Sequence, residues 1–450
     1  MKKLLIITLA LLLSVTVIAG PAPAIPEGIP LPLEPEEPAT EEPATETETL
    51  PEQGFEEAYP EAPGNDGESP HETDIVPEES VPPDAEPVIE PAEEHPPETH
   101  LTGSNGELFS EYHQQNAEGI FQNIHMVRFD MSNAAIVAEA VTAQERFGYT
   151  GSLADIVARY ETEKPGRTVV AAINGGFFQP IYTDERTHIW NNLILERELI
   201  HLGDTGSTIG FDRLGNPYMQ RLRIDTRAGV NGHWDRGNGF IVWGFNHVYD
   251  IPDSVAIFTS AYGEPIPAND FSKAVVIDNK VTELISDNTK TVDIPDNGFV
   301  VVTGDPKVLA RFTVGDEIEY LTRWRVYETA DNSYADTDWQ YIESALGAGP
   351  LLLGQGQIVL DAAGEGFTES KLIDKPSSHR SFIGLDTEGR LTLGTATNMT
   401  LPELCQFLLD KGLMQAINLD GGQSSALYYD GGLIVPGIRG VTDAIIISIE

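Results

Sequence analysis

Cysteine and basic residues are scarce in this 450-residue sequence. The single cysteine, Cys405, excludes an internal disulfide framework and a Cys-rich zinc site. Lysine and arginine number 27 against 71 aspartate and glutamate residues, which gives a formal net charge of −44. Because such a chain repels phosphate backbones and anionic membrane surfaces, we expect no nucleic-acid partner.

Long apolar runs are also scarce, and the one that stands out lies at the N-terminus. Lys2 and Lys3 precede the uncharged run Leu4–Ile18, which is followed by two small residues. This pattern predicts a secretory signal peptide over residues 1–20. At 15 residues the run is short for a membrane-spanning helix, and an uncleaved anchor is the alternative. We therefore expect a secreted protein, or one at the extracytoplasmic cell surface that meets the membrane only through an uncleaved N-terminal segment.

Acidic residues and prolines are concentrated in residues 21–100, which hold 24 Asp and Glu, 19 of the 31 prolines and no Lys or Arg. Such a segment buries too little apolar surface to offset its conformational entropy, so it is predicted to be an extended, disordered linker. It is interpreted either as a spacer that lifts the next domain from a cell surface or as a solubilising tail. Residues 101–450 then carry 47 acidic and 25 basic residues and are predicted to form one domain.

From about Phe121 onward, short β-branched and aromatic runs alternate with Gly, Asn and Asp, a pattern that predicts β-strands. The expected strands are Ile124–Met131, Ala135–Val141, Thr168–Ile173, Phe240–Trp243, Ala274–Ile277, Phe299–Thr303, Glu317–Arg323, Phe382–Leu385, Leu391–Thr395, Gln415–Asn418 and Ala444–Ile449.

Only two helices are predicted. One is Ser152–Glu163, with apolar residues at helical spacing. The other is Thr400–Lys411, where Thr400 is the expected N-cap, Glu403 completes a capping box and Gly412 terminates the helix. Two helices among many strands predict an α+β domain built on mixed sheets.

The segment AAINGGFF is the first of four that combine glycine with polar groups. Asn174 ends an apolar strand, and Gly175 and Gly176 permit a turn that larger residues cannot make. Asn174 could donate to a sugar hydroxyl or a phosphate oxygen, and Phe177 and Phe178 offer flat faces to a sugar ring. The alternative is a tight hairpin whose aromatic residues belong to the core.

The second segment is GAGPLLL. Gly347 and Gly349 could free backbone N–H groups to form an anion-binding nest, or they could simply form a flexible turn before a strand. No Gly-Lys-Ser/Thr follows, so the segment is not a P-loop.

The third segment is SSHRSFIG, in which His379 and Arg380 directly precede an apolar strand. The planar fork of an arginine matches two non-bridging oxygens of a phosphodiester. The alternative is a surface ion pair.

The fourth segment, AINLDGGQSSALYYDGG, is the strongest. Asp420 follows a strand, Gly421 and Gly422 leave room for a substrate, and Ser424 and Ser425 come next. A calcium loop is a poor match because the spacing of the acidic residues fits no standard loop. A serine-hydrolase elbow is also a poor match, because GQSSA lacks the closing glycine.

Taken together and in this order, the four segments resemble the phosphodiester glycosidase family, typified by N-acetylglucosamine-1-phosphodiester α-N-acetylglucosaminidase and its secreted bacterial relatives. The resemblance covers about residues 121–450 and is thinnest in 179–342. It implies hydrolysis of the bond between a sugar anomeric carbon and a phosphodiester. One departure is Gln423, which stands where the family has a third glycine and narrows the space beside Asp420.

The resemblance also implies roles for individual residues. Asp420 would act as base or nucleophile, Arg380 would hold the phosphate, and Asn174 would bind sugar hydroxyls or phosphate oxygens. The expected substrate-binding residues are Gly175, Gly176, Phe177, Phe178, Gly347, Gly349, His379, Gly421, Gly422, Ser424, Ser425 and Arg439.

Glycosidases usually pair two carboxylates, and the sequence does not identify the partner of Asp420. Glu343 and Asp430 are the nearest guesses by position. No cofactor is expected, and a need for a divalent metal stays open. The partner would be a glycan or a sugar-phosphate. The alternatives to a phosphodiester glycosidase are a non-catalytic glycan-binding or cell-envelope module on the same fold, and a serine-type esterase.

Overall fold

The computed structural model describes residues 98–179, 186–203, 205–235, 237–248, 253–286, 289–328, 333–368, 373 and 375–450. All of them belong to one compact unit, His95–Glu450. The predicted signal peptide and all but the last three residues of the predicted linker lie outside the described residues. Within the described ranges, no helix is both long and apolar enough to cross a membrane.

The largest sheet has eight strands and carries the C-terminal segments of the sequence analysis. Its strands, in spatial order, are β1 (Thr99–Thr102), β2 (Leu108–Gln115), β3 (Phe121–Phe129), β25 (Leu391–Ala396), β24 (Arg380–Asp386), β26 (Leu413–Leu419), β22 (Leu351–Gly354) and β23 (Gln357–Ile358).

Two five-stranded sheets pack with it. The first has the order β28 (Gly432–Pro436), β27 (Ala426–Tyr429), β5 (Thr168–Asn174), β29 (Asp443–Ile449) and β4 (Ile136–Thr142). The second has the order β11 (Pro217–Gln220), β10 (Ser207–Phe211), β21 (Ser344–Ala348), β8 (Leu193–Leu195) and β9 (Glu198–His201). A two-stranded ribbon, β6 (Phe178–Gln179) with β7 (His188–Ile189), leads from the first to the second.

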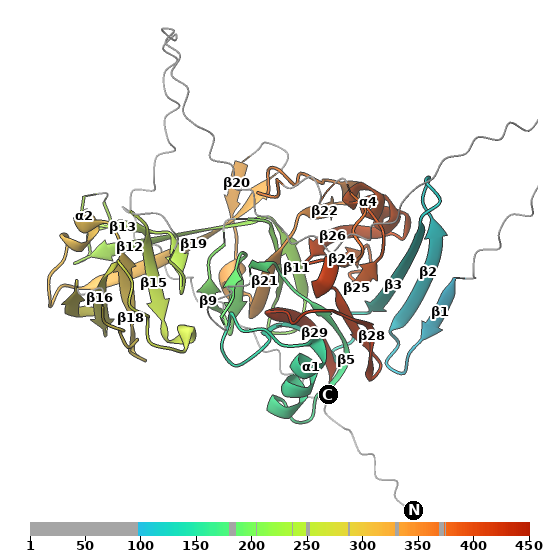
Figure 1. The fold of residues 1–450 in the computed structure, drawn as a ribbon, viewed down its shortest axis with the longest axis horizontal. Helices are drawn as coiled ribbons and strands as arrows, with labels where there is room; N and C mark the ends of the chain where they lie inside the picture. The colour runs from blue at the N-terminus through green and yellow to red at the C-terminus, as the bar shows by residue number, and fades with distance from the viewer. Residues whose placement is uncertain are drawn as a thin grey trace, which may run out of the picture. The chain divides into compact units, whose positions relative to one another are not determined.

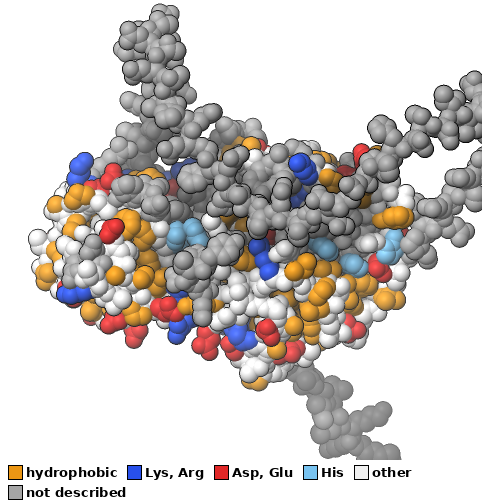
Figure 2. Space-filling model, in the orientation of Figure 1, with side chains coloured by type: hydrophobic (Ala, Val, Ile, Leu, Met, Phe, Trp, Pro, Cys, Tyr) orange, Lys and Arg blue, Asp and Glu red, His pale blue; other side chains and the backbone are white. Residues whose placement is uncertain are grey.

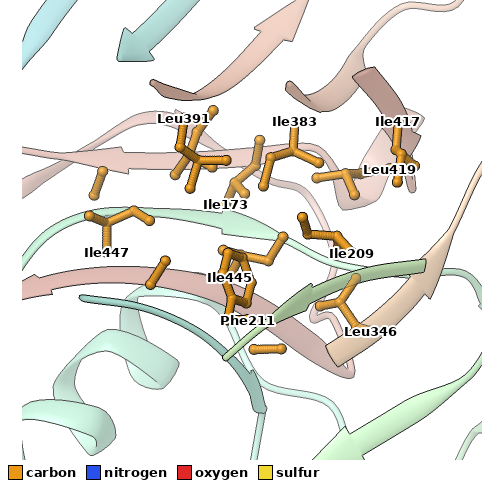
Figure 3. Close-up of a cluster of buried hydrophobic side chains, with 14 of the residues drawn as sticks. Ile173, Ile209, Phe211, Leu346, Ile383, Leu391, Ile417, Leu419, Ile445 and Ile447 are labelled. Carbon is orange, nitrogen blue, oxygen red and sulfur yellow. The ribbon is translucent and has the colours of Figure 1, made fainter. Parts of the chain in front are cut away.

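The main core lies between these three sheets. Figure 3 shows that Ile173 and Ile445 from one sheet, Ile383 and Ile417 from the eight-stranded sheet, and Phe211 from the third sheet converge on one another. Side chains alternate between the two faces of a sheet, so every second residue of each strand faces this core. The packing fixes the strand ends that carry the candidate site.

A second region consists of two further sheets with a core of their own. One has the order β13 (Phe240–Val242), β12 (Leu222–Val230), β19 (Ile318–Glu328) and β20 (Ser333–Asp336); the other has the order β14 (Gly244–Phe245), β15 (Val255–Thr259), β18 (Gly298–Thr303), β16 (Ser272–Ile277) and β17 (Lys280–Ile285). In Figure 1, β12, β13, β15, β16 and β18 gather at one end, while β1 to β3 and β24 to β26 lie at the other.

The two predicted helices are present. Helix α1 (Leu153–Glu163) has Ser152 as its N-cap, and α4 (Leu401–Asp410) begins with the predicted capping box between Thr400 and Glu403. Gly412 follows α4 with a φ of 83°, which suits glycine. Helix α4 covers the outer face of the eight-stranded sheet and buries Cys405. A third, short helix, α2 (Pro306–Leu309), lies in the second region.

Strand pairing confirms the α+β class. All eleven predicted strands are present, with ends shifted by at most a few residues. Apart from β14 with β15, the described pairs are antiparallel, so the sheets are less mixed than the sequence suggested. The AAINGGFF segment is not a hairpin, because β5 pairs with β27 and β29 instead of turning back on itself.

Candidate active site

Asn174 connects four strands at one edge of the core. It is the last residue of β5 and is fully buried. Its Nδ2 donates to the Asp420 carbonyl at 2.8 Å, and its Oδ1 accepts from the Ser381 hydroxyl at 2.7 Å and from the Ala426 backbone N–H at 3.0 Å. The side chain therefore positions the backbone around Asp420, and its oxygen is already occupied by protein donors.

Asp420 directly follows β26 and is 7% exposed. Its backbone N–H donates to the Gly175 carbonyl at 3.0 Å, which joins the first and fourth sequence segments. One carboxylate oxygen accepts from the Gly421 N–H and the other from Arg439 Nη2, each at 2.9 Å. Burial raises the pKa of Asp420, while Ser424, Arg439 and the Gly421 N–H oppose that rise.

Arg439 is the cation of the site. Its Nη2 binds Asp420, its Nε donates to the Ser424 hydroxyl at 2.6 Å, and its guanidinium lies 4.5 Å from the centre of the Phe178 ring. The Arg439 side chain is 36% exposed, whereas Ser424 is fully buried. Arg439 therefore presents positive charge to solvent directly beside a buried carboxylate.

The Arg380 guanidinium lies elsewhere. Its Nε donates to the Met399 carbonyl at 2.7 Å and its Nη2 to the Lys375 carbonyl at 3.2 Å. Successive strand residues point to opposite faces, so Ser381 reaches Asn174 while Phe382, like Arg380, faces the α4 side. The structure thus brings Arg439, and not Arg380, against Asp420. Burial lowers the pKa of Arg380 to about 10, opposed by the charge of Glu403.

His379 and the glycines after Asp420 contribute backbone contacts. The His379 carbonyl accepts from the Gly422 N–H at 2.8 Å, and a Cβ on Gly421 would lie 3.0 Å from the same oxygen. Gly422 has a φ of 61°. These contacts shape the turn Gly422–Ser424 that places the serine under Arg439. The His379 side chain is partly exposed.

Asp443 is a second carboxylate that the sequence reasoning missed. It is the first residue of β29, is 2% exposed, and accepts from the Gly176 N–H at 2.7 Å and from the Thr442 hydroxyl at 2.8 Å. Burial raises its pKa to about 6, and the charge of Asp420 adds to that rise. No sequence pattern marks Asp443, because only the pairing of Ala444 with Asn174 brings it to this edge.

Asp430 and Glu343, the two guesses for the second carboxylate, lie away from the place of Asp443. Asp430 is exposed in the turn after β27, at the opposite end of that strand from Ala426. Glu343 precedes β21 and is four residues from Gly347. Four residues of strand span about 13 Å. Neither residue therefore takes the place that Asp443 occupies.

The glycines of the first two segments allow a close approach of backbones. A Cβ on Gly176 would lie 2.3 Å from the Gly347 carbonyl oxygen, and one on Gly175 would lie 2.0 Å from Asp443 Oδ1. The N–H groups of Gly347 and Gly349 already donate to the carbonyls of Asn192 and Asn418. The predicted anion nest is therefore wrong for these two donors, because other strands use them.

The two phenylalanines belong to packed layers. Phe177 packs on Phe367 with ring centres 5.3 Å apart, and Phe178 is buried against the α1 cluster under Arg439. Both are less than a tenth exposed. The structure therefore places their rings in the core, as the alternative interpretation had it.

Two buried polar atoms near Asp420 have no hydrogen-bond partner within the described residues: Ser425 Oγ and Asn418 Oδ1. Ser425 adjoins Ser424, and Asn418 lies two residues before Asp420. Such atoms cost free energy unless a ligand or water satisfies them. The contacts of Ser424 are to an arginine instead of a histidine, which does not fit the general base of a serine esterase.

No group of three or more His, Cys, Asp or Glu residues is arranged to hold a metal ion in the described part of the chain. The two carboxylates, Asp420 and Asp443, each accept hydrogen bonds from the protein.

Comparison with known proteins finds one matching family model and several solved structures with a similar fold. Residues 272–448 match the family model described as "Phosphodiester glycosidase". No curated protein matches the sequence. The matched range contains Asp420, Arg439 and Asp443, while Asn174 lies before it.

Two solved structures share the fold. A hypothetical protein from Synechocystis is 21% identical with a TM-score of 0.65, and the match covers 79% of this chain and 64% of that one. This chain therefore spans less than two thirds of that protein's length. A protein from Burkholderia pseudomallei described as a candidate exported protein is 17% identical with a TM-score of 0.57, over 73% of this chain and 74% of that one.

A more distant likeness is to the catalytic domain of zebrafish N-acetylglucosamine-1-phosphodiester α-N-acetylglucosaminidase, auto-inhibited by its pro-peptide. It is 12% identical with a TM-score of 0.40, over 78% of this chain and 87% of that one. A likeness at that TM-score carries no argument about this chain.

Proposed function

We propose that this protein hydrolyses the bond between a sugar anomeric carbon and a phosphodiester, because residues 272–448 match the family model described as "Phosphodiester glycosidase". The expected substrates are of the N-acetylglucosamine-1-phosphodiester type. The observation that carries the proposal is a buried carboxylate, Asp420, held 2.9 Å from a half-exposed arginine, Arg439. An anionic leaving group and a developing sugar cation need that combination of charges.

Arg439 is the group we assign to the phosphate. Its contacts to Asp420 and Ser424 use two of the five N–H donors of a guanidinium, so three are left for substrate oxygens. The face stacked on Phe178 holds the group in one orientation. A phosphate that takes over the Nη2 donor would release Asp420 from its ion pair at the moment when substrate is bound.

Asp420 is the group we assign to the anomeric centre. A phosphodiester leaves as a stable anion, so protonating it matters less than stabilising the oxocarbenium-like transition state and supplying the attacker. Asp420 performs this task as base or nucleophile. Asn174 and the Gly175 carbonyl fix its backbone, and Ser425 Oγ, which is buried without a hydrogen-bond partner among the described residues, is assigned to a substrate hydroxyl.

Asp443 supports Asp420 indirectly, through the backbone of the neighbouring turn. It is too buried to meet a sugar directly, but its hydrogen bond to the Gly176 N–H holds the turn on which Asp420 rests. Its raised pKa and its coupling to Asp420 are typical of paired carboxylates in which one group retains a proton longer than the other.

The test is release of free sugar from a panel of sugar-1-phosphodiesters that includes UDP-GlcNAc and methylphosphate-linked GlcNAc. The parent chain should turn over at least one of them, and Asp420→Asn should lose about 10³-fold in kcat. Asp430→Asn is the matched control, because Asp430 is exposed at the far end of β27, and it should keep parental activity.

Other outcomes favour the alternatives. No turnover, combined with saturable binding of the same compounds that survives Asp420→Asn, would indicate a non-catalytic glycan-binding module. Covalent labelling of Ser424 or Ser425 by a fluorophosphonate would indicate a serine esterase.

The site of action is proposed to lie outside the cytoplasm, on a glycan or sugar-phosphate of the cell envelope. The support is the signal-like pattern of residues 1–20, together with the Burkholderia protein described as a candidate exported protein. Recovery of the protein from the cytoplasmic fraction of its host, with Met1 still present, would contradict this location.

A further inference from the structure

A cavity lies beside β7 of the β6–β7 ribbon, and the proposed function makes no use of it. Its volume is about 190 Å³. By the volume of liquid water this is space for roughly six water molecules. Three histidines from separate segments line it: His188 of β7, His201 at the end of β9, and His247 after β14. We call it the histidine cavity.

His201 presents an unused acceptor to this cavity. It is fully buried, and its Nδ1 lies 2.7 Å from the Asn191 carbonyl oxygen. A carbonyl can only accept, so Nδ1 carries the proton. Burial lowers the pKa of His201 to about 4, so the ring is neutral at pH 7 and Nε2 keeps its lone pair. That Nε2 is buried and has no hydrogen-bond partner among the residues that the structure describes.

Arg186 presents unused donors to the same cavity. Its guanidinium lies 3.9 Å from the centre of the Tyr262 ring and 5.3 Å from the rings of Phe147 and Tyr149, and its Nη2 donates to the Tyr262 carbonyl at 2.7 Å. Within the described residues, Nε and Nη1 are buried without a hydrogen-bond partner. Guanidinium donors in such a position call for an anionic acceptor.

The described lining residues carry net positive charge. Burial lowers the pKa of His188, and it lowers that of His247 to about 3, so both rings are neutral at pH 7 and Arg186 is the charged side chain of the lining. Asn269 of the lining accepts from Lys273 Nζ at 2.7 Å through its Oδ1, so the donor end of this amide is its Nδ2 group.

Glu264 is close enough for its charge to interact with that of Arg186, but among the described residues no hydrogen bond joins the two side chains. Glu264 accepts from Arg146 and from the Tyr149 hydroxyl, and it does not line the cavity. The other lining residues are largely apolar, among them Val248, Phe258 and Ile266. A ligand must therefore combine an anionic group, a hydroxyl donor and a C–H face.

We propose that the histidine cavity binds a small hydroxylated carboxylate of the size of one sugar acid, with the carboxylate on Arg186 and a hydroxyl donating to His201 Nε2. Val248, Phe258 and Ile266 then cover the C–H face of the ring. The two sets of buried, unpaired atoms become satisfied together, which neither a neutral sugar nor a plain fatty acid achieves.

The test is calorimetric titration of the full chain with glucuronate, glucose and cyclohexanecarboxylate at pH 7. Glucuronate should bind saturably and at least tenfold more tightly than glucose, which lacks the carboxylate, and than cyclohexanecarboxylate, which lacks the hydroxyls. Equal affinities for glucuronate and glucose, or no saturable binding of glucuronate, would overturn the proposal. Methyl glucuronide separates two sources of the ligand: its binding indicates a sugar acid at the end of a glycan, and its failure indicates the free acid.

Substitutions test whether glucuronate binds in the histidine cavity. Arg186→Gln and His201→Leu should each weaken glucuronate at least tenfold, while Arg213→Gln, at an exposed arginine outside the cavity, should leave it unchanged. Unchanged affinity in a folded Arg186→Gln would overturn the assignment. Asp420→Asn should bind glucuronate as the parent does, so a failure of the proposed glycosidase leaves this result independent.

Discussion

The Asp420 cluster (Asn174, Asp420, Ser424, Arg439 and Asp443) and the histidine cavity use an arginine in opposite ways. Both arginines lie against aromatic rings. In the cluster the guanidinium is paired with a carboxylate and a serine, whereas in the cavity two guanidinium nitrogens have no hydrogen-bond partner among the described residues. The cluster is an assembled set of opposite charges that a substrate must rearrange, and the cavity is an incomplete set that a ligand would complete.

The two regions also differ in the sign of their buried titratable groups. In the cluster, burial raises the pKa of acids, and in the cavity burial lowers the pKa of bases. In both cases the neutral form is favoured, because a low-dielectric interior penalises charge. Acids and bases nevertheless give opposite pH dependence, which offers a way to separate the two regions experimentally.

The largest effect on stability is expected for a substitution that adds a side-chain atom inside the Asp420 cluster. In Gly175→Ala the new Cβ would lie 2.0 Å from Asp443 Oδ1 and 2.8 Å from Leu346 Cδ2, so the backbone under Asp420 must move. Urea denaturation should show a loss of about 3 kcal/mol, and turnover should fall with it. Gly432→Ala is the control, since nothing lies within 4 Å of its Cβ. Equal stability of the two variants would show that the turn is not tightly packed.

The buried His201 of the histidine cavity should make the protein less stable in acid. Unfolded histidine takes up a proton near pH 6.5, but folded His201 resists until about pH 4, so the unfolded state binds more protons in that window. Stability should therefore be complete above pH 6.5 and fall by up to about 3 kcal/mol towards pH 4. His201→Gln should flatten this part of the profile in urea denaturation at pH 4.5 and pH 7. A parallel loss in both proteins would contradict the assignment.

The contribution of the Asp420 cluster to the stability of the protein should change with pH in the opposite direction. Asp443 in the folded state keeps its proton up to about pH 6, whereas in the unfolded chain it loses it near the ordinary value of 3.8. The folded state binds more protons between those values, so stability should fall as pH rises from about 4 to 6, by up to about 3 kcal/mol. In Asp443→Asn, whose Oδ1 can still accept from Gly176, this contribution should vanish and the profile should rise more steeply with pH. An unchanged slope would argue that Asp443 titrates normally.

The smallest effect separates two neighbouring serines. Ser424→Ala removes the hydroxyl that Arg439 binds at 2.6 Å and should cost about 1 kcal/mol. Ser425→Ala removes a buried hydroxyl without a partner and should change stability by less than about 0.5 kcal/mol. If Ser425 meets the substrate, its loss should still raise KM in the sugar-release assay. A stability loss in Ser425→Ala as large as that in Ser424→Ala would show that its hydroxyl has a partner.

Much of the candidate site was visible as strand ends. The sequence marks Asn174 and Asp420 because each follows an apolar run and precedes two glycines, and both lie where expected. Arg439 was expected to bind substrate, and its contact with Asp420 was not predicted. Arg380 shows the limit: its strand is correctly predicted, but its side chain faces α4.

The sequence by itself determined the strands, both longer helices with their caps, and the positions where only glycine can lie, because these depend on residues a few places apart. Tertiary structure alone decided which face each strand presents and which strands are neighbours. A shift of one residue in register turns every side chain to the other face, and register is set by partners far along the chain. Asp443 reaches Gly176 only because β29 pairs with β5, and Arg186 and His201 line one cavity with residues from distant segments such as Phe147 and Phe258.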